Sequence, residues 1–82
     1  MIPFWITPLN ALPSWTLGIG VTGHDKEDAV DFVSRMKIDG FVVDKIKVVQ
    51  SISELDQNHV FPNMGSVLRR GVWFPLGYDN LT

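Results

Sequence analysis

The 82-residue chain contains no cysteine, so it can form neither a disulfide framework nor a thiolate metal site. It also has no excess of positive charge, because seven basic residues stand against nine acidic ones and the formal net charge is −2. Nucleic acid is bound mainly through clustered basic side chains, so it is not an expected partner. The lack of cysteine suits a reducing compartment, and we expect a cytoplasmic location.

Charged side chains are missing from residues 1–23 altogether. A secretory signal needs a basic residue ahead of an unbroken apolar core, whereas Pro3, Pro8 and Pro13 interrupt this segment and no Lys or Arg precedes it. A membrane-spanning helix needs about 20 mainly apolar residues in succession. We therefore expect no membrane segment here, and interpret the region as buried strands joined by proline-bearing turns.

Two strands are predicted within this uncharged region. Residues 2–7 (IPFWIT) are aromatic and β-branched, and the nearby prolines favour an edge position because proline donates no ladder hydrogen bond. Residues 15–22 (WTLGIGVT) alternate large apolar side chains with Gly and Thr, which is typical of a strand with two unlike faces.

An amphipathic helix is predicted over about residues 25–37. Asp25 has the character of an N-cap, and Asp28 stands at the position of a short-armed capping box. Apolar residues follow at helical spacing, and Gly40 is a plausible stop.

The remainder of the chain predicts two more strands and a short turn. Residues 41–50 form a strand with one wet face, and Ser51 and Glu54 have capping-box spacing over a single helical turn at 51–55. Residues 58–66 are rich in turn formers, and residues 67–75 form a last strand with Gly71 as a bulge or bend. The order β-β-α-β-(short helical turn)-β predicts a single α+β domain over 1–82, with one main helix on a small mixed or antiparallel sheet of three to four strands.

The glycines at positions 18, 20 and 23 match the spacing G-x-G-x-x-G of dinucleotide-binding loops. The chain is too short for the several βα units of such a fold, and the helix opens with three carboxylates where a phosphate needs bare backbone N–H groups. We predict instead that Gly18 and Gly20 leave one strand face bare for close packing, and that Gly23 lets the chain turn into the helix. No cofactor is expected.

The loop histidine is the candidate for chemistry. His59 follows Asp56 by three residues, and Ser66 is near in sequence. Such a pair could orient a catalytic base or supply two metal ligands, but no third ligand is evident nearby in sequence. A histidine bound to the loop backbone is the more common situation, so no catalytic residue and no metal site is assigned.

Binding residues are expected in the loop and in the C-terminal segment. Arginine and aromatic side chains are enriched at binding hot spots, although Trp73 and Phe74 could equally complete the core. The candidate binding residues are His59, Asn63, Arg69, Arg70, Trp73, Phe74 and Tyr78.

The segments GIGVTGHDKEDA (18–29), NHVFPNMG (58–65) and RRGVWFP (69–75) together resemble a small group of uncharacterised bacterial proteins. The resemblance covers most of the chain and implies no activity or functional residue. In size, acidity and lack of cysteine the chain also resembles immunity proteins that neutralise toxins, although by analogy only.

The leading hypothesis is a non-enzymatic interaction module that binds a protein partner or a second copy of itself near 56–66 and 69–78. It is motivated by three Trp, five Phe and one Tyr in so short a chain, since apolar side chains left exposed in patches mark interfaces. The alternative is a small enzyme or ligand-binding domain centred on His59, with Asp56, Asn63 and Arg70 as polar neighbours.

Overall fold

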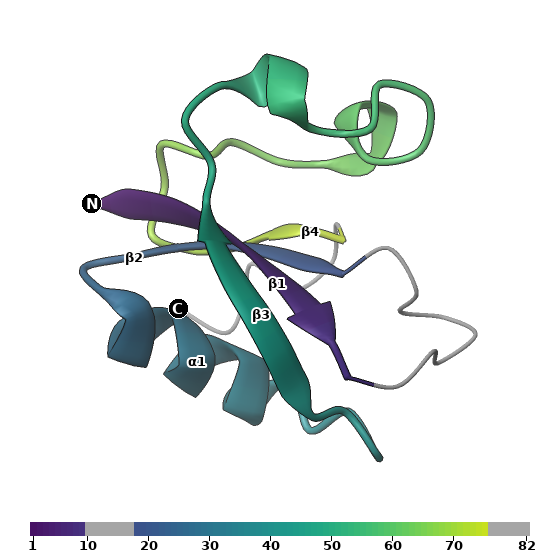
Figure 1. Cartoon of the computed structure of the whole chain (residues 1–82). Helices are drawn as coiled ribbons and strands as arrows, with labels where there is room; N and C mark the ends of the chain where they lie inside the picture. Colours follow the sequence, from purple (N-terminus) through teal and green to yellow (C-terminus); the bar gives the residue numbers. More distant parts are fainter. Residues whose placement is uncertain (10–17, 76–82) are drawn as a thin grey trace.

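The computed structural model describes residues 1–9 and 18–75, which form an antiparallel sheet between two unlike layers (Figure 1). The sheet has the strand order β3-β1-β2-β4, from β1 (Ile2–Pro8), β2 (Ile19–Gly23), β3 (Val43–Val48) and β4 (Gly71–Phe74). Helix α1 (Lys26–Arg35) packs on one face. The opposite face is covered by residues 49–68, here called the loop layer, with the 3-10 turns η1 (Ile52–Glu54) and η2 (Phe61–Asn63). The predicted α+β fold and element order are confirmed.

The sheet separates two apolar clusters. Phe4, Ile6 and Val21 face α1 and pack with Phe32. The second cluster lies under the loop layer and contains Val49, Leu55, Val60, Trp73 and Phe74. Side chains alternate between the two faces along β1, so Phe4 and Ile6 belong to the first cluster and Trp5 packs against the second.

The predicted edge position of residues 2–7 is wrong, because β1 is an inner strand paired with β2 on one side and β3 on the other. The prolines lie where the ladder tolerates them. Pro3 takes part as an acceptor, since its carbonyl oxygen accepts the Val49 N–H at 2.9 Å. Pro8 lies at the end of the strand, where the register with β3 shifts. β2 and β3 run in the same direction with β1 between them, and α1 lies on the connection.

The helix begins as the sequence predicts. The Asp25 carboxylate accepts the Asp28 N–H at 2.8 Å, and the Asp28 carboxylate accepts the His24 N–H at 2.8 Å. Asp28 thus reaches one residue beyond the N-cap, and Gly23 leaves room for it, since a Cβ there would stand 2.9 Å from Asp28 Oδ2. At the other end the helix stops at Arg35, because Lys37 adopts the left-handed conformation with φ 54°. The left-handed residue that terminates the helix is therefore Lys37, and the stop predicted at Gly40 lies too far along the chain.

Three other predicted elements are shifted or shortened. The strand predicted over 41–50 is β3 at Val43–Val48, and that predicted over 67–75 is β4 at Gly71–Phe74. Of the strand predicted over 15–22, residues 15–17 lie outside the described residues, and the described part is β2 at Ile19–Gly23. The predicted capping box at Ser51 and Glu54 is present on η1. Gly71 has φ 130° and bends the chain into β4, whereas the bulge lies further along, where the register between β2 and β4 shifts at Gly20 and Val21.

Candidate functional site

An aromatic row crosses the sheet under the loop layer. The ring of Trp5 on β1 lies 6.0 Å from that of Trp73 and 5.5 Å from that of Phe74, measured between centroids, although β2 separates their strands. Gly20 on β2 stands opposite Trp5 in one ladder and opposite Phe74 in the other. Its bare face lets the rings meet, because a Cβ at Gly20 would stand 2.4 Å from the Trp73 ring. The close packing predicted over this glycine is thus observed.

The bulge in the β2–β4 ladder turns two successive aromatic residues toward one core. Val72 packs with the helix-side cluster, whereas both Trp73 and Phe74 belong to the cluster under the loop layer. A regular strand would send neighbours to opposite faces. The two rings are 3% and 8% exposed, so they lie inside the fold and support Trp5 from behind.

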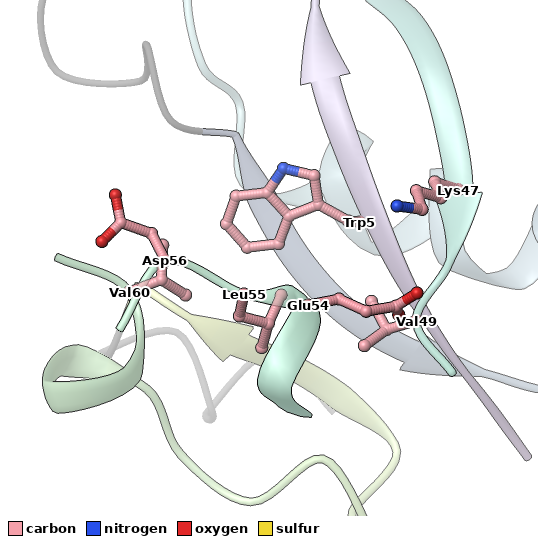
Figure 2. A pocket seen from close by; sticks show the side chains of 7 residues that line it. All are labelled: Trp5, Lys47, Val49, Glu54, Leu55, Asp56 and Val60. Carbon is pink, nitrogen blue, oxygen red and sulfur yellow. The ribbon is translucent and has the colours of Figure 1, made fainter. Parts of the chain in front are cut away.

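A pocket of about 160 Å³ opens between Trp5 and the loop layer (Figure 2). Its lining is Trp5, Lys47, Val49, Glu54, Leu55, Asp56 and Val60. The three aliphatic side chains are buried and the three charged residues are exposed, so an apolar interior has a charged rim. Figure 2 shows the Trp5 indole above Leu55 and Val60, with the Asp56 carboxylate on one side of the indole and the Lys47 amine on the other.

The sheet register places two of these side chains together. Trp5 on β1 pairs directly with Lys47 on β3, so both project toward the loop layer as cross-strand neighbours. Val49 continues from the end of β3 and is held by its N–H bond to the Pro3 carbonyl at 2.9 Å. One wall of the pocket is therefore set by the sheet.

The η1 turn fixes the second wall and its charge. Glu54 Oε2 accepts the N–H of Gln50 at 2.7 Å and that of Ser51 at 3.2 Å. These backbone bonds lower the pKa of Glu54, with the Gln50 bond first and a smaller contribution from the Lys47 charge. Glu54 is therefore ionised at neutral pH. The Ser51 and Glu54 side chains make the two reciprocal bonds of the capping box, which fix the turn that ends in Leu55.

Asp56 organises the turn that follows. Its Oδ1 accepts the N–H of Asn58 at 2.8 Å and that of His59 at 3.0 Å. Its backbone carbonyl also accepts the N–H groups of Val60 and Phe61 at 3.1 and 2.9 Å. The backbone bond from Asn58, then that from His59, then the His59 ring lower the pKa of the Asp56 carboxyl. The rim thus carries a second fixed negative charge.

The predicted loop residues lie next to this pocket. His59 Nδ1 lies 3.2 Å from Asp56 Oδ2, and the His59 side chain is 69% exposed. Asn63 donates from Nδ2 to the His59 carbonyl at 2.9 Å, which ties η2 to the turn. Asp56, His59 and Asn63 are therefore together, as members of one hydrogen-bonded turn.

The predicted arginines are not part of that turn. Arg70 binds Asp28 on α1 through two hydrogen bonds, Nε to Oδ2 at 2.9 Å and a terminal nitrogen to Oδ1 at 2.6 Å. Its guanidinium also lies 4.9 Å from the centroid of the Phe32 ring. Arg70 thus joins β4 to the helix layer, on the side of the sheet away from His59. Arg69 is exposed, and Tyr78 lies outside the described residues.

Residues 1–9 and 18–75 hold neither a cluster of metal ligands nor a membrane-spanning helix. Asp56 and His59 meet, but no group of three His, Cys, Asp or Glu side chains in this part of the chain could hold a metal ion. None of the helices described is both long and apolar enough to cross a membrane.

A second hollow lies between α1 and β3, with a volume of about 300 Å³. Its lining is Val30, Val33, Ser34, Lys37, Ile38, Phe41 and Val43. A binding site generally places several polar groups around an apolar interior to orient its ligand. This groove offers Ser34, whose hydroxyl already donates to the Val30 carbonyl at 3.1 Å, and a single charge on Lys37. The Trp5 pocket is the better candidate.

Sequence reasoning missed Trp5, Lys47 and Glu54 as site residues. The sequence does contain two signals, the alternation of Lys45 and Lys47 in a strand and the capping-box spacing of Glu54. Neither signal indicates that these side chains lie near Trp5, which follows only from the sheet register and the position of the turn. No family model, curated protein or solved structure matches the chain.

Proposed function

We propose that the chain is a non-enzymatic module that binds another protein through the loop layer, with the Trp5 pocket receiving one side chain of that partner. The pocket itself carries the proposal, since it combines an aromatic face, buried aliphatic walls and a charged rim. Such a combination is typical of the centre of a protein interface, where an anchor side chain enters a pocket surrounded by polar groups.

The size of the pocket favours a side chain over a metabolite. Pockets for small molecules and cofactors generally measure about 300–1,000 Å³. The volume of about 160 Å³ is well below that range. It is close to the roughly 150 Å³ of an apolar cavity that holds one benzene molecule. One side chain of a larger partner fits these dimensions.

The loop layer offers further apolar contact area. Ile52, Phe61 and Leu68 on the loop layer are 40%, 49% and 84% exposed. Exposed apolar side chains mark an interaction surface where they form a contiguous patch. The partner would therefore cover the loop layer and not only fill the pocket.

The contact between His59 and Asp56 favours a second candidate, a small enzyme or ligand-binding domain. A carboxylate that holds the Nδ1 side of an imidazole is the arrangement that orients a catalytic base. The expected polar neighbours already have other hydrogen-bond partners, however. Arg70 donates to the Asp28 carboxylate on the other side of the sheet, and the Asn63 amide donates to the His59 backbone carbonyl and not to its ring. This candidate requires a substrate-dependent activity that His59→Ala abolishes, and a protein-binding module predicts none.

Site-specific photo-crosslinking in the native host tests the proposal. A photoreactive phenylalanine analogue would replace the exposed Asn58 beside the pocket or, as the control, the exposed Glu27 on α1. We expect one discrete crosslinked protein from position 58, absent from position 27 and competed away by excess unlabelled wild-type chain. Sedimentation then distinguishes a foreign partner from a second copy of the chain. Either partner agrees with the proposed function, and an immunity-like role would be one case of a foreign partner. Equal or absent crosslinking at the two positions would contradict it.

A further inference from the structure

The charges around the Trp5 pocket are unevenly balanced. In Figure 2 the Lys47 amine lies on one side of the indole and the Asp56 carboxylate on the other. The Lys47 charge acts on Glu54, whereas Asp56 contacts the His59 ring, which carries a charge only when it is protonated. Lys47 and Glu54 therefore offset each other at one end. At the other end, the His59 ring is the one basic group that the described residues place against the Asp56 carboxylate, and that end attracts a cation.

The Asp56 carboxylate also has room for one more donor. A carboxylate has about four acceptor positions on its two oxygens. Oδ1 accepts the N–H groups of Asn58 and His59, and within residues 1–9 and 18–75 Oδ2 has the His59 ring nitrogen as its one partner. These bonds hold the carboxylate in place and leave one position on Oδ2. A cationic donor there would form a charge-assisted hydrogen bond without reorganising the turn.

Trp5 supplies the rest of the recognition. An indole is the best aromatic partner for a cation, and its face also packs well on aliphatic stems. Trp5 is held by Trp73 and Phe74 behind it, with centroids at 6.0 and 5.5 Å. Leu55 and Val60 lie opposite the indole, so the pocket is a slot between an aromatic face and aliphatic walls.

We infer that this slot takes the side chain of a lysine or arginine from the partner protein. The aliphatic stem lies between the Trp5 indole and Leu55, and the cationic head reaches Asp56 Oδ2. This assignment rests on the proposed protein-binding function and names the chemistry of the side chain that enters. An aliphatic side chain would fill the slot but leave Asp56 unused, and an acidic one would meet two carboxylates.

A titration followed by 15N NMR tests the assignment on the full chain. The probes are the N-acetyl methylamides of lysine and arginine, with those of norleucine and citrulline as neutral controls of similar shape. We expect saturable shifts of the Trp5 indole N–H and of the Asn58 and His59 amides with the cationic probes. The neutral probes should bind about fivefold more weakly, the upper range for an ion pair at a partly exposed rim.

Matched variants separate charge from shape. Asp56→Asn keeps an oxygen acceptor for the turn but removes the charge, and should weaken lysine-probe binding about fivefold. Asp44→Asn removes another exposed carboxylate, from β3 and outside the pocket lining, and should leave the affinity unchanged. Lys47→Met keeps the stem, removes the repelling ammonium, and should strengthen binding of both cationic probes. This third variant tests the charge argument even if Asp56→Asn disturbs the turn.

Three results would overturn the assignment: equal binding of the neutral probes, unchanged affinity in both Asp56→Asn and Lys47→Met, or no saturable shift with any probe. The crosslinking at position 58 is read separately. Crosslinking without a cation preference leaves the protein-binding function standing and overturns the lysine or arginine assignment. Cationic probes that bind while no crosslink forms show a cation site and contradict the protein-binding function.

Discussion

The Trp73 ring lies directly over Gly20, so closely that a Cβ at position 20 would stand 2.4 Å from two ring carbons and 2.6 Å from a third. This relationship connects the sheet to the candidate site. Gly20 leaves a gap between β1 and β4, the bulge in β4 turns Trp73 into it, and Trp5 then packs against the ring from the other side. The packing of Gly20, Trp73 and Trp5 against one another thus fixes the aromatic wall of the pocket.

The first prediction concerns that contact. Gly20→Ala should destabilise the fold by about 1–3 kcal/mol, because the new methyl group overpacks a closed core. For a domain of this size that corresponds to a fall in Tm of roughly 4–8 °C for each kcal/mol. Thermal and urea unfolding followed by far-UV circular dichroism measure it.

A double-mutant cycle shows whether the cost comes from the Trp73 ring. Trp73→Leu alone should also destabilise, since it removes buried aromatic surface. In the double variant the alanine methyl would occupy part of the space that the indole vacates. The double variant should therefore lose less unfolding free energy than the two single variants lose together. Strict additivity would show that the Gly20 effect arises elsewhere in the strand.

The second prediction concerns the bond that ties the loop layer to the sheet. Thr22 is 1% exposed, and its hydroxyl donates to the Val67 carbonyl at 2.8 Å across 45 residues of sequence. Thr22→Val keeps the shape but leaves that carbonyl without its donor, which should cost about 1–3 kcal/mol. The unfolding free energy in urea measures the effect.

Thr7→Val is the matched control for that substitution. Its hydroxyl donates to the Lys45 carbonyl at 3.4 Å at an exposed site, where water replaces a lost bond. The free energy of unfolding should therefore change little. Equal losses in the two variants would contradict the role given to Thr22.

The third prediction concerns stability in acid. The Asp28 side chain is 14% exposed, and the bidentate bond from Arg70, followed by the His24 N–H, lowers its pKa from 3.8 to about 2. A carboxyl whose pKa is lower in the folded chain stabilises that state above its ordinary pKa, and this stability is lost as the pH falls through the folded value. The wild-type chain should therefore lose stability between pH 3.8 and about 2.

Asp28→Asn should lose stability less steeply over that interval, since its side chain cannot ionise. Arg70→Met removes the partner but keeps an apolar stem near Phe32, and it should flatten the same part of the profile. Glu54 and Asp56 also have lowered pKa values, so part of the acid loss remains in both variants. Urea midpoints across the acid range measure the profiles, and a slope unchanged in both variants would refute this role of the pair.

The fourth prediction concerns the η1 turn. Ser51→Ala removes one half of the capping box, which should cost about 0.5–2 kcal/mol in the local stability of the turn. Because Leu55 and Asp56 follow that turn, lysine-probe affinity should fall as well. Amide hydrogen exchange at Glu54 and Leu55 measures the first effect. Unchanged exchange with unchanged affinity would show that the cap does not position the pocket.

Local signals in the sequence predicted the elements whose stabilising contacts are local. The start of α1 follows from Asp25 and Asp28, and the η1 turn follows from Ser51 and Glu54, because each of these hydrogen bonds spans at most four residues. The close packing over Gly20 was also predictable, since an alternating strand with a bare face requires a neighbour there.

Contacts that join distant parts of the chain were not predictable in this way. Trp5, Lys47 and Asp56 meet only through the β1–β3 register and the path of the loop layer. Arg70 pairs with Asp28 across 42 residues, a partner that no spacing rule indicates. The inner position of β1 was missed for a related reason: prolines indicate an edge only when they interrupt the ladder, and Pro3 contributes through its carbonyl oxygen.

The most direct test of the central claim is the position of a bound lysine side chain. Intermolecular nuclear Overhauser effects from N-acetyl-lysine methylamide to the wild-type chain give that position. We expect contacts from the side-chain methylenes of the probe to the Trp5 ring and to the methyl groups of Leu55 and Val60. Contacts to the groove of Val30 and Phe41 instead, or none to Trp5, would contradict it.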